Sequence, residues 1–354
     1  MTLNALLDKL ATQKGSDLHL VVGQPPVLRV EGQLVRCPEG PILDHLAMES
    51  LLFPHLTEAQ RTLLEQGQDI EKTLRVEQNR FRFHVFHERG NLAASLRMIP
   101  TRVPTLEELG LTHGPYAVFQ KLTELKRGLI IVTGPTGSGK STTVSAMVEE
   151  INRQRAERII TIEDPIVFEF ESKQSVVSQR TVGEDVPNFP YGLRSAMRED
   201  PDVLLIGETR DPETMVLTLT LAETGHLVFS TLHVNTASEA VQRLIEAFPE
   251  SHQPVIRRLV ATNLQAVVAQ KLLPRADRPG RVAVHEILLG TPRIRRMIAE
   301  GQHDLTVGIE AGRNLGMRTM DDDLVRLAEQ GIISHEVAWF CLEDKERLQR
   351  KENT

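Results

Sequence analysis

The sequence has few cysteines and no long apolar segment, and both absences narrow the class of protein. Only two of its 354 residues are cysteines, Cys37 and Cys341, and they do not form a CxxC pair. They suggest neither a zinc cluster nor a disulfide framework, and a reducing cytoplasm fits. No segment approaches the roughly 20 apolar residues that cross a bilayer. Residues 1–4 lack a basic region before an apolar core, so we expect neither secretion nor membrane insertion.

An excess of positive charge is also missing. Lysine and arginine number 41 against 48 aspartate and glutamate residues, which gives a formal net charge of −7 and an isoelectric point near 6.0. The chain as a whole therefore does not resemble a protein that binds the nucleic-acid backbone, although a basic lining inside an assembly would escape this test. We expect no nucleic acid among its partners.

What the sequence does contain is a nucleotide-phosphate cradle. The residues Gly-Pro-Thr-Gly-Ser-Gly-Lys-Ser at 134–141 follow the apolar run 129–133 and precede a helical pattern that begins at Thr142. Glycines at these places let consecutive backbone N–H groups face an anion, and the N-terminus of the next helix adds partial positive charge. Lys140 should reach the terminal phosphates of ATP or GTP, and the Ser141 hydroxyl should hold Mg²⁺. The alternative is a glycine-rich turn with a lysine present by chance.

The predicted nucleotide-binding residues all lie in this cradle. They are Gly134, Pro135, Thr136, Gly137, Ser138, Gly139, Lys140, Ser141 and Thr142.

Around the cradle, the hydrophobic pattern predicts two domains. Over residues 1–100, short strands and helical stretches, one of them from about 44 to 65, indicate a small α+β domain. In the segment 80–86 of this domain, polar and apolar residues alternate, which predicts a half-buried strand with a basic face. Prolines and glycines punctuate residues 101–115, which we interpret as the interdomain connection.

The second predicted domain covers residues 116–354 and is of the α/β class. Apolar runs separated by helical patterns predict a mostly parallel sheet flanked by helices. The runs lie at 129–132, 159–162, 203–206 and 227–230. Beyond residue 251 the pattern is largely helical, with one β-like stretch at 281–287 and a helical C-terminal region from about 291.

Two glutamates follow predicted strands. Glu163 comes directly after the run 159–162, and Glu208 follows the run 203–206 with Gly207 in between. Because ligands collect outside the carboxyl ends of such strands, both should face the same crevice as Lys140. Phosphoryl transfer to water needs a carboxylate to orient the nucleophile and oxygen ligands for Mg²⁺. The alternative is that both glutamates are ordinary capping carboxylates.

Two histidines flank another predicted strand. A strand at 227–231 would put His226 at its start and His233 just past its end, so the two need not share a site. His233, at the carboxyl end, is better placed to sense a γ-phosphate. The alternative for isolated histidines is a hydrogen-bonded structural role.

Five stretches together resemble the Walker A, Asp box, Walker B and His box regions of the secretion-type ATPases. They are Gly-Pro-Thr-Gly-Ser-Gly-Lys-Ser-Thr-Thr at 134–143, Thr-Ile-Glu-Asp-Pro-Ile at 161–166, Arg-Glu-Asp-Pro-Asp at 198–202, Gly-Glu-Thr-Arg-Asp at 207–211 and Glu-Thr-Gly-His-Leu-Val-Phe-Ser-Thr-Leu-His at 223–233. In addition, Gly-Ser-Asp-Leu-His-Leu at 15–20 and Arg-Phe-Arg-Phe at 80–83 resemble the N-terminal domain of the PilT-type ATPases that retract type IV pili. The resemblance covers nearly the whole chain.

This resemblance implies a PAS-like N-terminal domain followed by a RecA-like P-loop NTPase domain. It implies a cytoplasmic homohexameric motor that hydrolyses ATP with Mg²⁺ and drives pilus retraction in twitching motility. Its expected partners are an inner-membrane pilus platform protein of the PilC type, at which it would be peripheral, and other pilus ATPases.

The resemblance also implies roles for single residues. Glu163 and Glu208 would be the water-activating and Mg²⁺-associated carboxylates, and His226 would couple nucleotide state to motion. Arg82 and Arg97 match arginines of the N-terminal domain that approach the phosphates when the domains close, adding charge in the transition state. The alternative is that both arginines lie on a solvated strand face.

One stretch departs from the retraction motors. Where they carry a motif close to Ala-Ile-Arg-Asn-Leu-Ile-Arg-Glu, residues 293–300 read Arg-Ile-Arg-Arg-Met-Ile-Ala-Glu, which keeps Arg295 and Ile298. Taken alone, the stretch predicts an amphipathic helix with a basic face. Two other functions stay open: a translocation ATPase of the secretion and conjugation branch, and an accessory PilU-like ring subunit with weak hydrolysis.

Overall fold

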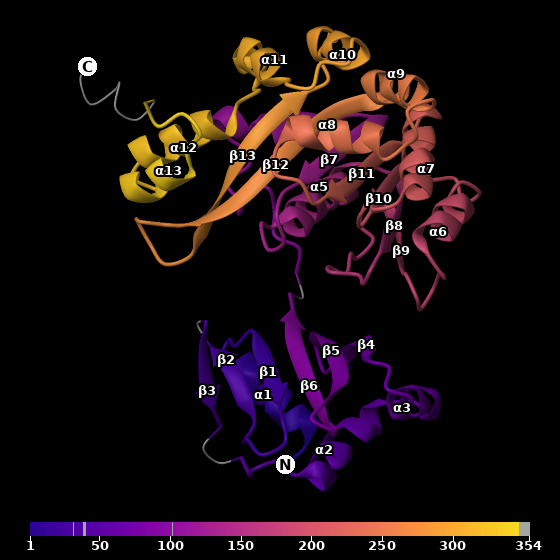
Figure 1. Cartoon of the computed structure of the whole chain (residues 1–354), viewed down its shortest axis with the longest axis vertical. Helices are drawn as coiled ribbons and strands as arrows, with labels where there is room; N and C mark the ends of the chain where they lie inside the picture. Colours follow the sequence, from indigo (N-terminus) through magenta and orange to yellow (C-terminus); the bar gives the residue numbers. More distant parts are fainter. Residues whose placement is uncertain (31, 38–39, 101, 347–354) are drawn as a thin grey trace. The chain divides into compact units, whose positions relative to one another are not determined.

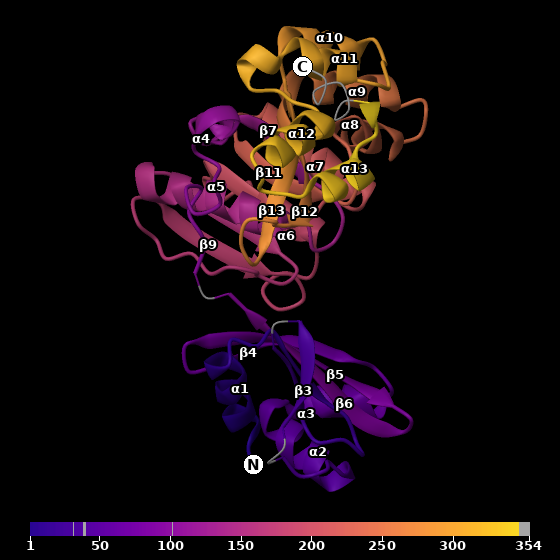
Figure 2. The ribbon, with the colours of Figure 1, turned by 90° about the vertical axis from the view of Figure 1, so that its left-hand side faces the viewer.

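The computed structural model describes residues 1–30, 32–37, 40–100 and 102–346. The chain forms two compact units, Met1–Arg102 and Val103–Thr354, each built around its own sheet (Figure 1, Figure 2). Within the described ranges, no helix is both long enough and apolar enough to cross a membrane.

The first unit contains a six-stranded antiparallel sheet in the order β3-β2-β1-β6-β5-β4. Its helices begin at capping side chains, Thr2, Asp44 and Thr57, and bury their apolar sides in one core with the sheet. In chain order the elements are α1 (Leu3–Thr12), β1 (Asp17–Leu20), β2 (Val27–Val30), β3 (Gln33–Arg36), α2 (His45–Leu52), α3 (Glu58–Glu65), β4 (Ile70–Val76), β5 (Asn79–Glu88) and β6 (Asn91–Ile99).

The predicted α+β class of this unit is confirmed, with two corrections. The helical stretch expected from about 44 to 65 is two helices, because a 3-10 turn at Phe53–His55, with Pro54 in it, ends α2. Arg80, which strict alternation placed on an exposed basic face, is only 4% exposed. Alternation breaks at the start of β5, where Arg80 and Phe81 are both buried.

The second unit contains a seven-stranded sheet in the order β13-β12-β7-β11-β10-β8-β9. Neighbouring strands pair in parallel from β12 to β9, and β13 pairs antiparallel with β12. The elements up to β13 are α4 (Val118–Thr123), β7 (Gly128–Thr133), α5 (Lys140–Gln154), β8 (Arg158–Glu163), β9 (Val176–Thr181), α6 (Phe189–Ala196), β10 (Val203–Ile206), α7 (Pro212–Glu223), β11 (Leu227–Leu232), α8 (Ala237–Glu246), α9 (Gln253–Asn263), β12 (Leu264–Pro274) and β13 (Arg281–Leu289).

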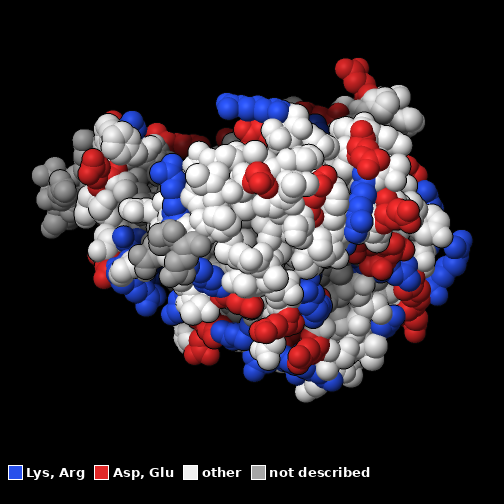
Figure 3. Space-filling view, turned by 90° about the horizontal axis from the view of Figure 1, so that it is seen from below, with Lys and Arg blue, Asp and Glu red and all other residues white. Residues whose placement is uncertain are grey.

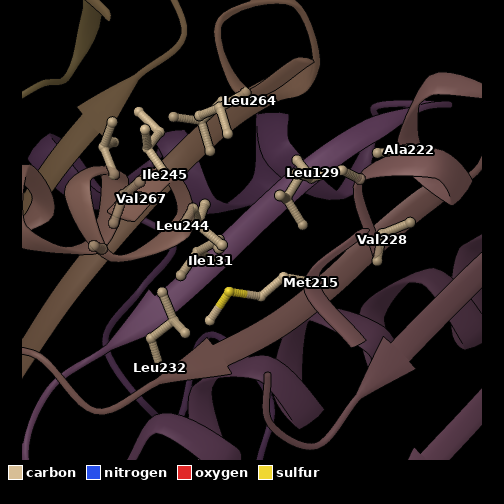
Figure 4. Packing of buried hydrophobic residues seen from close by; sticks show 14 of the residues in the cluster. Leu129, Ile131, Met215, Ala222, Val228, Leu232, Leu244, Ile245, Leu264 and Val267 are labelled. Carbon is tan, nitrogen blue, oxygen red and sulfur yellow. The ribbon is translucent and has the colours of Figure 1, made fainter. Parts of the chain in front are cut away.

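Helices cover both faces of this sheet, which is why its central strands are continuous apolar runs. Every residue of β7 and of β11 is buried. Leu129 and Ile131 of β7 pack with Met215 of α7 and Leu244 of α8 on one face (Figure 4). The intervening residues of β7 pack with α4 and α5 on the other face. The predicted parallel sheet flanked by helices is therefore confirmed.

The region beyond residue 251 is less helical than expected. Besides β13, which matches the predicted stretch 281–287, it contains the eleven-residue strand β12 directly after α9. β9 was not expected either. Figure 1 shows β12 and β13 as a long ribbon with α12 and α13 beside it. The final helices are α10 (Pro292–Ala299), α11 (Thr306–Ala311), α12 (Met320–Glu329) and α13 (His335–Cys341).

Charges of both signs are mixed on the face drawn in Figure 3. Basic and acidic side chains border a broad uncharged area there, and they form no continuous positive surface on that face. This distribution agrees with the nearly balanced count of basic and acidic residues.

Candidate active site

A phosphate-binding loop connects β7 to α5. The helix begins at Lys140, two residues earlier than the sequence pattern indicated, with Gly139 as its N-cap. Gly139 has a φ of 87°, a left-handed conformation that glycine adopts at little cost. The first four N–H groups of a helix have no acceptor within it, and the helix dipole adds positive charge at the same end. The loop therefore has the backbone of an anion site.

Lys140 is folded back on this loop. Its Nζ donates hydrogen bonds to the carbonyl oxygens of Gly134 and Pro135, at 2.9 and 3.0 Å. Only 7% of the residue is exposed. Burial lowers the pKa of the Lys140 ammonium, and the negative charge of Glu208 acts in the opposite direction. Phosphate oxygens could replace the two carbonyl acceptors and would stabilise the charged form further.

The loop also contains a hydroxyl group that could donate a hydrogen bond to a phosphate. The Ser138 hydroxyl is buried and has no hydrogen-bond partner among the residues that the structure describes. A buried hydroxyl without a partner is unfavourable, and a phosphate oxygen would satisfy it. Ser141, in the first turn of α5, is exposed and is the hydroxyl available to a metal ion beside the phosphates.

Glu163 and Glu208 lie at the same edge of the sheet as this loop. β8 and β10 pair in parallel up to Ile162 and Ile206. Glu163 is the last residue of β8, and Glu208 follows β10 after Gly207. Glu163 is 5% exposed, and its carboxylate accepts hydrogen bonds from the Thr161 hydroxyl at 2.8 Å and the Val167 N–H at 3.3 Å.

Glu208 has an arginine and a histidine beside its carboxylate. The Arg210 Nε lies 2.6 Å from its Oε2, and the His233 Nε2 lies 3.3 Å from the same oxygen.

The alternative that the two glutamates cap helices is wrong, since the next helices, α6 and α7, are capped by Asn188 and Asp211.

Gly207 allows the close approach of the strand ends. Its N–H donates to the Ile162 carbonyl at 2.8 Å, and a Cβ atom at position 207 would lie 3.1 Å from the Glu163 Cα. A side chain there would press on Glu163. This gives a packing reason for glycine at a position where many P-loop enzymes have aspartate.

The two histidines lie at opposite ends of β11, as the sequence predicted. His233 follows the strand and lies beside Glu208. His226 precedes it, and its Nδ1 lies 2.9 Å from the Leu221 carbonyl oxygen and 3.1 Å from the Thr224 hydroxyl. Six strand residues separate the histidines, which is about 20 Å. Within this chain His226 is therefore remote from the phosphate loop.

Arg82 and Arg97 are a cross-strand pair in the first unit. They are directly opposite each other on β5 and β6, with 44% and 69% of their side chains exposed. Arg82 Nε lies 2.9 Å from Glu71, and Arg97 Nε donates to Asp17 at 2.7 Å. Hydrogen bonds from Ser16 and Arg97 lower the pKa of Asp17 although burial, the largest single influence, acts to raise it. Both arginines are thus exposed and held by carboxylates.

The stretch 293–300 forms the amphipathic helix that its pattern predicted, α10. Ile294, Met297 and Ile298 are its buried residues. Arg295 turns inward, and its guanidinium donates to the carbonyl oxygens of Gly290, at 2.6 Å, and Ala261, at 3.1 Å. Arg295 therefore joins α10 to the end of α9.

One residue at the site, Gln270, was not predicted from the sequence. It lies on β12, the strand that was expected to be helical, and its side chain contacts the phosphate loop and α5. A glutamine in a mostly apolar run belongs to no motif that would have singled it out.

The chain is similar over nearly its whole length to known secretion and pilus proteins. Residues 2–339 match a family model described as type II/IV secretion system protein. The chain is 43% identical over 340 residues to the type IV pilus retraction ATPase PilT of Pseudomonas aeruginosa, covering 96% of this chain and 97% of that protein. It is 41% identical over 315 residues to a twitching motility protein of Neisseria gonorrhoeae, covering 88% and 83%. A crystal structure of the pilus retraction motor PilT with bound ADP matches 99% of both chains at 38% identity, with a TM-score of 0.90.

Proposed function

The chain belongs to the type II/IV secretion system protein family, and on that premise we propose that it is an ATP-driven motor that retracts type IV pili. As a member of this family it is an ATPase. The observation that supports the proposal most is the placement of the phosphate loop, Glu163 and Glu208 at one edge of the second unit's sheet. The similar proteins named for pilus retraction and twitching motility indicate the work that hydrolysis drives.

Each group at this edge has a proposed task. Lys140 exchanges the carbonyl oxygens of Gly134 and Pro135 for the terminal phosphate oxygens of ATP. Mg²⁺, held beside the phosphates by Ser141 and Glu208, would supply positive charge against the phosphate oxygens. Glu163, fixed by its hydrogen bonds from Thr161 and Val167, orients the attacking water.

Arg82 and Arg97 add charge at a later step. In our proposal they leave Glu71 and Asp17 and reach the phosphates when the two units close on a nucleotide. A cation that arrives only on closure stabilises the transition state more than the bound substrate, and this ties hydrolysis to movement. His226, remote from the loop within one chain, is assigned to the coupling of nucleotide state to motion.

The proposed working form is a homohexameric ring at the cytoplasmic side of the inner membrane. The similarity to a pilus retraction motor over 99% of the chain supports it. A platform protein of the pilus machine, of the PilC type, is the proposed partner through which the ring acts, and other pilus ATPases are further candidates.

The test is restoration of twitching in a bacterium that has pili but lacks its own retraction ATPase. The wild-type chain should restore expansion of the colony edge, and Lys140→Ala should not. Purified protein should hydrolyse ATP at the same rate with and without added DNA. Strong stimulation by DNA, without restored twitching, would replace the proposal with a translocation ATPase. Tight ATP binding without turnover would replace it with an accessory ring subunit.

A further inference from the structure

Gln270 joins two points of the phosphate-binding segment that are five residues apart. Its Nε2 donates to the Ser138 carbonyl oxygen at 2.6 Å, and its Oε1 accepts from the Thr143 hydroxyl at 2.8 Å. All three residues are 2% exposed. Ser138 lies before Lys140 and Thr143 lies after it, so one amide ties the end of the loop to the first turn of α5.

The orientation of this amide is determined by its partners. The Ser138 carbonyl can only accept a hydrogen bond, so it must face the Gln270 NH₂ group. The Thr143 hydroxyl can then donate to the Gln270 oxygen. The Ser138 bond alone sets the orientation, because a hydroxyl can donate or accept and a flipped amide would place the Gln270 oxygen against the Ser138 carbonyl oxygen.

The backbone of Gln270 is also close to the loop. β12 pairs in parallel with β7 up to Ala269 and Thr133, so Gln270 comes level with the start of the loop. A Cβ atom at Gly134 would lie 2.2 Å from the Gln270 carbonyl oxygen, and one at Gly139 would lie 2.8 Å from its Nε2. The loop therefore lies directly against this residue at both of its ends.

The bond to Ser138 fixes the peptide unit between Ser138 and Gly139. In a trans peptide the C=O and N–H groups point in opposite directions. With the Ser138 carbonyl held toward Gln270, the Gly139 N–H points away from β12, and it makes no hydrogen bond to the described part of the chain. A free N–H at the N-cap of α5 is a group that phosphate oxygens bind.

We propose that Gln270 is a positioning residue for nucleotide binding, which aims the Gly139 N–H at the phosphates by holding the Ser138 carbonyl. The inference rests on the proposed function, since it assumes that this loop binds nucleotide. It adds a residue from the strand β12 to a site otherwise built from the carboxyl ends of β7, β8 and β10. Its two side-chain bonds have different tasks: the bond to Ser138 orients the peptide, and the bond to Thr143 only holds the amide.

The test compares two variants that each break one of these bonds. Gln270→Glu keeps the size of the side chain and an oxygen for Thr143 but removes the donor to Ser138. Thr143→Val keeps the size of the side chain and the Ser138 bond but removes the hydroxyl. The measurements are the Kd for ADP by titration calorimetry, KM and kcat for ATP, and the Tm of the nucleotide-free protein.

Gln270→Glu should weaken ADP binding and raise KM at least tenfold, with kcat at saturating ATP within about threefold of wild type, because the contact acts on bound nucleotide before and during reaction. Thr143→Val should keep the Kd within about threefold even though both variants lower Tm. An unchanged Kd for ADP in Gln270→Glu would overturn the inference. It would also be overturned if both variants lost the same affinity for ADP in proportion to their fall in Tm.

The same titrations separate this inference from the proposed function. Wild type that binds ADP, with Lys140→Ala that does not, supports the nucleotide site whatever Gln270→Glu does. Wild type without affinity for ADP would overturn both proposals.

Discussion

His233 lies beside Glu208, with 3.3 Å between its Nε2 and the Glu208 Oε2. The Glu208 side chain is 14% exposed and that of His233 is 42% exposed, so the histidine is the more exposed of the two. His226, at the other end of β11, contacts the end of α7 through its ring Nδ1. The two histidines should therefore affect different steps.

His233→Ala should lower kcat for ATP about tenfold or more, because Glu208 loses a partner that orients it. Its Kd for ADP should stay within about threefold of wild type. His226→Ala should keep both values within about threefold and yet fail to restore twitching. Steady-state ATPase assays beside colony-edge measurements check this, and equal loss of ATPase activity in the two variants would contradict the division of roles.

Gly207→Ala should lower kcat about tenfold with little change in nucleotide affinity. The new methyl group would lie 3.1 Å from the Glu163 Cα, so the end of β8 must shift by a few tenths of an ångström. Overpacking of this kind costs about 1–3 kcal/mol and displaces the Glu163 carboxylate. Kinetics and the Tm of the variant measure both effects, and full activity would show that the position of Glu163 is not critical.

Arg97→Ala and Arg82→Ala should each lower kcat at least tenfold while the Kd for ADP is kept, because in our proposal these cations reach the phosphates only at a later step. Arg36→Ala is the matched control, since Arg36 is also an exposed arginine on a strand of the first unit. It should leave kcat unchanged. If all three variants behave alike, Arg82 and Arg97 lie on a solvated strand face and have no part in hydrolysis.

His285 should make the second unit sensitive to acid. Burial lowers the pKa of this fully enclosed ring to about 4, although Asp323 acts to raise it. In the unfolded chain His285 has its ordinary pKa near 6.5, so between pH 6.5 and 4 it binds a proton that it does not bind in the folded chain. The contribution of His285 to the free energy of unfolding is therefore fully present above pH 6.5 and is lost as the pH drops toward 4. The loss is about 2 kcal/mol at pH 5.

The matched variant for this prediction is His285→Leu. Within the described part of the chain, neither ring nitrogen of His285 has a hydrogen-bond partner, and the ring packs edge-on against Tyr116 and Phe119. An apolar replacement therefore removes no hydrogen bond there. The difference between the urea unfolding midpoints at pH 7.5 and pH 5.0 should be smaller in His285→Leu than in wild type. The same acid shift in both proteins would assign it to other groups.

The sequence alone was enough to predict the strand and loop around Lys140 and the placement of Glu163 and Glu208. Each of these strands is an apolar run that ends at a glycine-rich turn or a carboxylate, and this local pattern is sufficient to place the residues at the strand's carboxyl end. The two histidines at the ends of β11 could be placed for the same reason.

β12 and Gln270 could not be predicted because their surroundings are not local. Residues 264–273 are an apolar run that comes directly after a helix, and only pairing with β7, more than a hundred residues earlier, makes them a strand. The start of α5 at Lys140 likewise depends on Gly139 taking a left-handed conformation, which the helical pattern does not reveal.

The measurement that tests the central claim most directly is ATP turnover by the purified wild-type chain beside Glu208→Gln, with ADP affinity and oligomeric mass determined in the same buffer. We expect hydrolysis by a hexamer, reduced at least a hundredfold in the variant, while ADP binding stays within about threefold because the Lys140 loop is intact. Equal turnover in the two proteins would contradict the assignment of the site, and a wild-type chain that binds ADP without hydrolysing ATP would contradict the motor itself.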